Sequence, residues 1–102
     1  QEVGRYKDGL KDGEWVYTYE NGRKNFVGSF VDGDPNGKQK WYHPNGQLML
    51  EGKYNLGVQQ GDFTWYNEQG IAITVIQFKD GVEVKIDGER IPAPYHLDEV
   101  TP

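Results

Sequence analysis

Residues 28–51 read GSFVDGDPNGKQKWYHPNGQLMLE, and the segments on either side repeat the same spacing of glycine and aromatic residues. Thirteen of the fourteen glycines fall into four series with a period of 24 residues, which begin at Gly4, Gly9, Gly13 and Gly22. No insertion or deletion interrupts three successive periods. Such self-similarity is typical of a repeat array, in which each unit buries its apolar face only against its neighbours.

Each period contains two turn signals. The first is Asn-Gly, at Asn21-Gly22 and Asn45-Gly46, with Gln69-Gly70 in the third copy. This pair favours a two-residue type I′ hairpin, because both central residues must adopt positive φ. The second signal is a stretch with two glycines four positions apart, which predicts a longer loop between hairpins, at residues 8–13, 32–37 and 56–61.

With Asn-Gly as the turn, the cross-strand pairs follow. They are Tyr17 with Phe26, Val16 with Val27, Trp15 with Gly28, Trp41 with Leu50, Lys40 with Glu51, Trp65 with Thr74 and Phe63 with Ile76. Strands are predicted near residues 2–7, 14–19, 24–30, 38–43, 48–54, 62–67, 72–79 and 82–87. Helical periodicity is absent from the sequence. We therefore expect an all-β, elongated single-layer antiparallel sheet of tandem β-hairpin repeats.

The two ends of the chain differ from its middle. After Phe78, Asp80-Gly81 and an alternating run at 82–86 predict one tight hairpin that caps the array. The array is predicted to cover residues 1–87, with repeats at about 4–27, 28–51 and 52–75 and a partial one at 76–87, followed by an irregular acidic tail at 88–102. The first strand lacks its hairpin partner, so upstream repeats or a leader are expected, and its open edge suits pairing with a second copy.

The composition excludes several classes of partner. Eleven basic and 16 acidic residues give a formal charge of −5, so nucleic acid and anionic lipid would be repelled. No stretch approaches the roughly 20 apolar residues that span a bilayer, and membrane insertion is not expected. Without cysteine the redox compartment stays open. The chain begins at Gln1, which slightly favours a secreted or periplasmic protein over a cytoplasmic one.

The repeated unit resembles a known family. Gly28-x-Phe30-x-x-Gly33-x-x-x-Gly37 followed by Trp41-Tyr42-x-x-Asn45-Gly46, with its copies at either side, resembles the MORN repeat, and more closely the bacterial variant in proteins labelled YwqK-family antitoxins. The resemblance covers roughly residues 4–80. It implies a structural, protein-binding module with no catalytic residues and no cofactor, and an aromatic-lined grooved face. Gln39 departs from the pattern, because Trp15 and Phe63 fill that slot in the other repeats.

Two segments contain chemistry-bearing residue types. Asp32-x-Asp34-x-Asn36-Gly37 matches the first half of a calcium loop, but His43 stands where the bidentate Glu belongs. Ser29 and His43 would need an orienting carboxylate and a nucleophile elbow to act as a hydrolase. We therefore expect no metal site, no cofactor and no catalytic residue, and thus no enzyme.

The aromatic stripe is the candidate binding surface. Strand parity places Trp15, Tyr17, Trp41, Phe63 and Trp65 on one face, where the stripe serves as a core, a binding surface or both. The predicted partner is another protein or peptide, with an antitoxin-like role as one form. Glycan binding is the alternative. The candidate residues are Trp15, Tyr17, Trp41, Tyr42, Phe63, Trp65 and Tyr66, with Trp41 and Trp65 as hot spots.

Overall fold

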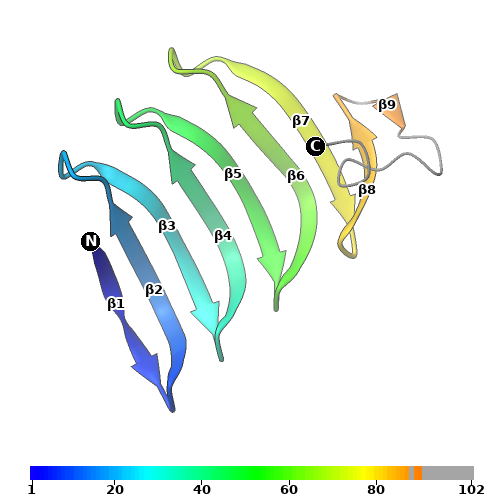
Figure 1. The fold of residues 1–102 in the computed structure, drawn as a ribbon. Coiled ribbons are helices and arrows are strands. Elements are labelled where there is room, and N and C mark those ends of the chain that lie inside the picture. The colour runs from blue at the N-terminus through cyan, green and yellow to red at the C-terminus, as the bar shows by residue number, and fades with distance from the viewer. Residues whose placement is uncertain (88, 91–102) are drawn as a thin grey trace, which may run out of the picture.

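The computed structural model describes residues 1–87, 89 and 90. They form one open antiparallel sheet in which nine strands follow each other in chain order (Figure 1). The strands are β1 (Glu2–Lys7), β2 (Leu10–Thr18), β3 (Lys24–Val31), β4 (Asp34–Tyr42), β5 (Leu48–Asn55), β6 (Val58–Tyr66), β7 (Ala72–Lys79), β8 (Val82–Ile86) and β9 (Glu89–Arg90). The prediction of an all-β single sheet of hairpins is confirmed.

The cross-strand register follows the prediction. Trp15 pairs with Gly28, Lys40 with Glu51, and the other five predicted pairs also form. Because side chains alternate between the two faces of a strand, this register places the large aromatic residues on one side of the sheet.

The two turn types are the reverse of the prediction. The tight two-residue turns are Asp8-Gly9, Asp32-Gly33, Leu56-Gly57 and Asp80-Gly81, in which both residues have positive φ. At Asp8 φ is 52°, and at Gly9 it is 80°. Asp-Gly satisfies a type I′ turn as well as Asn-Gly does. The six-residue loops predicted at residues 8–13, 32–37 and 56–61 are therefore absent, whereas the sequence predicts the tight turn at Asp80-Gly81.

The Asn-Gly turns are the longer ones. Gly22 N donates to Tyr19 O at 2.9 Å, and Tyr19 N donates to Arg23 O at 2.8 Å. Only the glycine has positive φ, while the Asn21 side chain accepts the Arg23 N–H at 2.9 Å. The result is a wider turn with a bulge at its base, between Tyr17 and Thr18. That bulge offsets the added turn residue, which is why the predicted register still holds.

The second glycine of each predicted loop lies inside a strand. Gly13, Gly37 and Gly61 have φ between 73° and 92°, and the register shifts opposite each of them. A positive-φ residue within a ladder produces a bulge, which bends the strand. The strands β2, β4 and β6 therefore begin four residues earlier than predicted, and the sheet is curved (Figure 1).

Hydrogen bonds connect the tight turns of successive hairpins. Gly33 N donates to Lys11 O at 3.0 Å, Gly57 N to Pro35 O at 2.7 Å, and Gly81 N to Gln59 O at 2.9 Å. The three acceptors are themselves one period apart. Equivalent backbone positions of neighbouring repeats therefore bind one another, which fixes the spacing between hairpins.

The carboxyl end of the array continues the same pattern. Asp80-Gly81 forms the predicted tight hairpin, but this turn matches the other three and does not distinguish the cap. What differs is β8, whose five residues replace the nine of β2, β4 and β6. Within the predicted tail, Glu89–Arg90 forms β9 against β8, while residues 88 and 91–102 lie outside the described part of the chain.

The densest packing lies near this end. Phe63, Ile76 and Phe78 are buried and pack together. Ile76 stands where the earlier repeats have glycine, and it pairs with Ile86. The side chains of Ile76 and Ile86 therefore add apolar contacts between β7 and β8.

Candidate functional site

One side of the sheet carries two groups of contacting aromatic rings. Within each group, the centroids of contacting rings lie 4.9 to 6.3 Å apart, with edge-to-face or tilted geometry. The first group extends from Tyr6 to Trp41, and the second contains Tyr54, Phe63 and Phe78. We call this surface the aromatic face; its members are Tyr6, Trp15, Tyr17, Phe26, Phe30, Trp41, Tyr54, Phe63, Trp65 and Phe78. In a single-layer sheet these side chains provide the core as well as a surface.

Glycine makes room for the largest rings. A Cβ atom on Gly4 would lie 2.2 Å from the Trp15 ring, and one on Gly52 would lie 2.3 Å from the Phe63 ring. Trp15 also donates from Nε1 to Arg5 O at 3.1 Å. Both aromatic side chains thus lie flat over the neighbouring strand, and both are almost fully buried.

The predicted stripe divides into buried and half-buried members. Trp15 and Phe63 are 3% and 4% exposed and act as core residues. Tyr17, Trp41 and Trp65 are half-buried, so their rings remain accessible. The stripe therefore supplies core residues and also leaves three rings accessible to a partner.

Tyr42 and Tyr66 do not join the other predicted residues. Each directly follows a tryptophan of the aromatic face, so strand alternation turns it to the opposite side. Tyr66 donates its hydroxyl to Glu51 Oε1 at 2.9 Å, and this bond raises the pKa of Tyr66. These two tyrosines are not brought together with Trp41 and Trp65 on one surface.

Five rings of the aromatic face are absent from the predicted site. Tyr6, Phe26, Phe30, Tyr54 and Phe78 come from β1, β3, β5 and β7, the strands that alternate with those of the predicted stripe. Four of them recur at the 24-residue period, and Phe26 is the predicted cross-strand partner of Tyr17. The period combined with the register therefore contained the signal for these residues.

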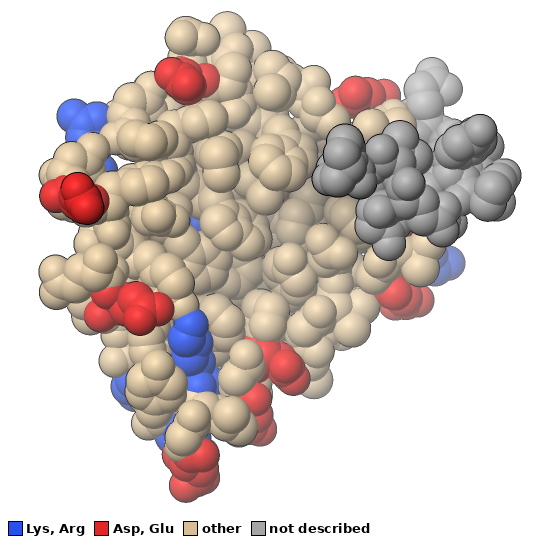
Figure 2. Space-filling view, in the orientation of Figure 1, with Lys and Arg blue, Asp and Glu red and all other residues tan. Residues whose placement is uncertain are grey.

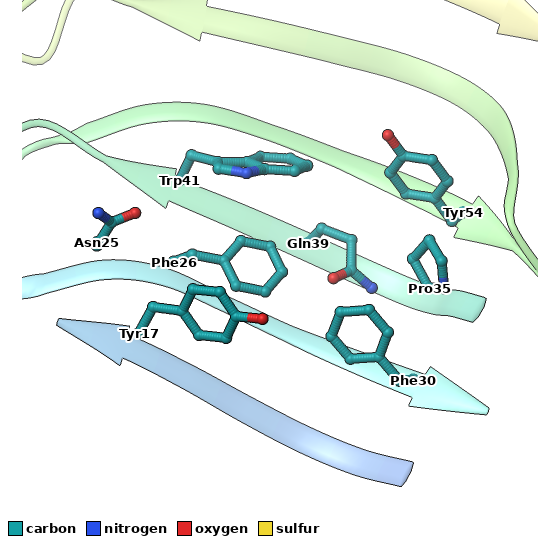
Figure 3. Close-up of a pocket in the computed structure, with 8 residues that line it drawn as sticks. All are labelled: Tyr17, Asn25, Phe26, Phe30, Pro35, Gln39, Trp41 and Tyr54. Carbon is teal, nitrogen blue, oxygen red and sulfur yellow. The ribbon is translucent and has the colours of Figure 1, made fainter. Parts of the chain in front are cut away.

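The aromatic face contains two cavities. The larger, of about 270 Å³, is open to solvent and lies between β2 and β5 (Figure 3). Its lining residues are Tyr17, Asn25, Phe26, Phe30, Pro35, Gln39, Trp41 and Tyr54. The smaller, of about 140 Å³, is lined by Trp41, Leu50, Tyr54, Gln59, Phe63, Trp65, Ile76 and Phe78. Trp41 and Tyr54 separate the two, and burial raises the pKa of Tyr54.

Gln39 is the buried polar residue of the larger cavity, whereas Asn25 is half-buried. Only 1% of the residue is exposed, and its Nε2 donates to Ser29 O at 2.9 Å. Its Oε1 is buried and accepts no hydrogen bond. A buried acceptor without a partner costs about 1–3 kcal/mol. In the other repeats this slot holds an aromatic ring, so the exchange to glutamine leaves both a polar wall and space for a ligand.

The two chemistry-bearing segments have structural roles. Asp32-Gly33 is a tight turn, and Asn36 Oδ1 accepts the backbone N–H of Leu56 at 2.9 Å. Ser29 pairs with Glu14 within the sheet, whereas His43 lies in a turn and contacts Tyr66 O at 2.9 Å. Among the described residues, no three His, Cys, Asp or Glu side chains lie close enough to hold a metal ion.

Charged residues surround an uncharged surface. Figure 2 shows one face of the molecule, with an uncharged centre and most of its Asp and Glu side chains towards the margins. Within residues 1–87, 89 and 90, no helix has the length and hydrophobicity that crossing a membrane requires.

Comparison with known families identifies the repeat. Residues 35–56 match the MORN repeat variant family, and this segment spans β4, the following turn and β5. No curated protein matches the chain. The matched segment contributes Pro35, Gln39, Trp41 and Tyr54 to the larger cavity, so the family match and the candidate site coincide.

Proposed function

We propose that this protein is an interaction module that binds another protein on its aromatic face. The match of residues 35–56 to the MORN repeat variant family, whose members are generally non-enzymatic repeat modules, supports this proposal. The observation that carries the proposal is the open cavity beside Trp41, lined mainly by rings and by one buried polar side chain. Sites of this composition, mostly apolar with a few placed polar groups, are typical of binding sites.

The shape of the face favours an extended peptide segment. The two cavities lie side by side and share Trp41 and Tyr54, so alternate side chains of one strand could enter both. Trp41 contributes to both cavities, which places it at the centre of the proposed surface. Large rigid aromatic residues in such positions contribute most to binding energy.

An antitoxin-like role is a narrower form of the same proposal, in which the bound protein is a toxin. Its support is the resemblance of the repeats alone. Glycan binding is the alternative, and it draws on half-buried Trp41 and Trp65 lying one period apart.

The experiment compares two substitutions at adjacent residues. Trp41→Leu changes the aromatic face, whereas Tyr42→Ala changes the opposite face and serves as the control. Immobilised wild-type protein is used to capture a partner protein from the source organism, and the partner's affinity for each variant is then measured by calorimetry. Trp41→Leu should weaken binding by about tenfold or more, and Tyr42→Ala by less than about twofold. Both variants are checked for folding by circular dichroism.

Equal binding by wild type and a folded Trp41→Leu protein would contradict the proposal. Retention of the wild type by polysaccharide beads, with loss in Trp41→Leu and no protein captured, would support the glycan alternative instead.

A further inference from the structure

A lysine of the protein itself lies among aromatic rings one repeat before the larger cavity. We call this position the first subsite, and the equivalent positions in the next two repeats the second and third subsites. Lys11 Nζ is 4.9 Å from the Trp15 ring centroid, 4.8 Å from that of Tyr17 and 5.2 Å from that of Phe30. It also donates to the Tyr17 hydroxyl. Three rings around one ammonium group form a cation–π cage, of the kind that recognises alkylammonium ligands.

The hydrogen bond to Tyr17 raises the pKa of Lys11. The cage therefore favours the protonated side chain. In this first subsite the cation and its aromatic surroundings belong to one chain.

The second copy of the cage has no lysine. One 24-residue period further along the chain, the residues equivalent to Lys11, Trp15, Tyr17 and Phe30 are Pro35, Gln39, Trp41 and Tyr54. All four of these residues line the 270 Å³ cavity (Figure 3). The backbone is equivalent, because Lys11 O and Pro35 O each accept the N–H of the next turn glycine. The short ring of proline therefore leaves open the space that the lysine side chain fills one repeat earlier.

The third copy contains the smaller cavity of about 140 Å³, which a neutral side chain narrows. One further period leads to Gln59, Phe63, Trp65 and Phe78, which line the smaller cavity. Gln59 stands at the position equivalent to Lys11 and hydrogen-bonds to Tyr54, so its amide side chain partly fills the third subsite. Of these three subsites, the second is the one in which the residue at the Lys11 position, Pro35, is too short to fill the space.

We propose that the second subsite binds the ammonium group of a lysine side chain from a partner protein, in the way that the first subsite holds Lys11. The proposal rests on the proposed function and names the chemistry of the partner at this site. The Lys11 cage shows that rings at the positions of Tyr17 and Phe30, which Trp41 and Tyr54 occupy in the second subsite, accommodate a cation. A volume of about 270 Å³ lies just below the range of ~300–1,000 Å³ for small-molecule sites and suits a single side chain.

The charge of the protein also favours a cation at the second subsite. The formal charge of −5 attracts a positively charged partner, and Asp32 and Asp34, which precede Pro35 in the sequence, are exposed. The Gln39 side chain adds a polar group to the lining of the cavity.

The probe is a five-residue peptide, acetyl-Gly-Ser-Lys-Ser-Gly-amide, and its control is the same peptide with norleucine, which keeps the methylenes but removes the charge. Nitrogen-resolved NMR spectra of wild-type protein are recorded during titration with each peptide into the millimolar range. The lysine peptide should shift the signals of Phe26, the Trp41 indole and Tyr54. It should bind about fivefold or more tightly than the norleucine peptide.

Two variants make the test specific to the second subsite. Pro35→Lys reproduces the first subsite and should abolish the shifts, because the new ammonium group occupies the cage from within. Lys11→Gln removes the ammonium group of the first subsite and leaves Pro35, Gln39, Trp41 and Tyr54 unchanged, so the shifts of Trp41 and Tyr54 should stay in place. Circular dichroism establishes that both variants fold.

Equal affinity for the two peptides would overturn the proposal for lysine while leaving protein binding on the aromatic face intact. Absence of shifts with either peptide, or full binding by a folded Pro35→Lys protein, would also overturn it. The peptide comparison uses wild-type protein, so it decides the matter even if Pro35→Lys does not fold. The partner-binding experiment with Trp41→Leu is independent of charge and separates the two proposals.

Discussion

The first and second subsites have equivalent backbones and different interiors. In the first, Lys11 lies among rings and Trp15 covers Gly4; in the second, Pro35 leaves a cavity and Gln39 covers Gly28. The backbone of the repeat therefore determines where a subsite lies. The side chains at the positions of Lys11 and Trp15 determine whether it is filled. The third subsite, with Phe63 over Gly52, returns to the aromatic arrangement. The middle repeat thus combines the least regular packing with the most open surface.

The largest expected effect on stability comes from removing the side chain that covers a glycine of the neighbouring strand, which is Phe63 over Gly52 in the third subsite and Gln39 over Gly28 in the second. Phe63→Ala should lower the free energy of unfolding by about 3–5 kcal/mol, because Phe63 is 4% exposed and packs on Ile76 and Phe78. Gln39→Ala should cost about 1 kcal/mol, since it removes the hydrogen bond to Ser29 together with the unpaired acceptor. Urea unfolding of both variants checks this difference. Similar losses would mean that the second subsite is packed as tightly as the third.

Filling the space above the glycines should give the next effect. Gly52→Ala should cost about 2–3 kcal/mol, because the added methyl group would meet the Phe63 ring at 2.3 Å. Gly28→Ala should cost about 1 kcal/mol less, although its methyl group would meet Gln39 Oε1 at 1.7 Å and Phe26 Cζ at 2.4 Å, because both side chains border the cavity into which they can move. Neither glycine has positive φ, so backbone strain does not contribute. Thermal melts of the two variants measure the comparison, and a larger loss for Gly28→Ala would contradict it.

The smallest effect should be the pH dependence of the first subsite. The hydrogen bond to Tyr17 raises the pKa of Lys11 in the folded protein, so its contribution to stability is full below the ordinary lysine pKa of 10.5. That contribution is lost as pH rises through the higher folded pKa. Lys11→Met removes it, so the variant should show a shallower loss of stability above about pH 10, by less than about 1 kcal/mol. Unfolding curves at alkaline pH test this, and parallel curves for wild type and variant would rule it out.

Much of the fold follows from the sequence, because a fixed period and strand alternation determine the register. The turns were assigned in reverse, since Asp8-Gly9 and Asn21-Gly22 both tolerate positive φ. The bulge at Gly13 explains why the predicted start of β2 is four residues too late. A glycine four residues after a turn glycine is consistent with a bulge inside a strand as well as with the end of a loop. The register survived because the bulge beside Thr18 offsets the longer turn.

The candidate site was predicted in part. The alternation of side chains along a strand places the tryptophans on one face. The same alternation places Tyr42 and Tyr66 on the opposite face, so these two residues do not belong to the predicted site. Gln39 was visible as a break in the pattern. Its burial and the cavity beside it depend on how neighbouring side chains fill space, which spacing alone does not specify.

The hydrogen bonds between successive tight turns have a consequence for how the chain can grow. Because Gly33, Gly57 and Gly81 each bind the carbonyl of the residue 22 positions earlier, every turn has the same neighbour relation. Duplication of one whole 24-residue unit would reproduce each bond, whereas an inserted segment of another length would leave a glycine N–H facing the wrong carbonyl. Lengthening by complete units is therefore the change that this architecture tolerates, and each new unit would bring its own subsite, whose residue at the Lys11 position decides whether it is closed or open.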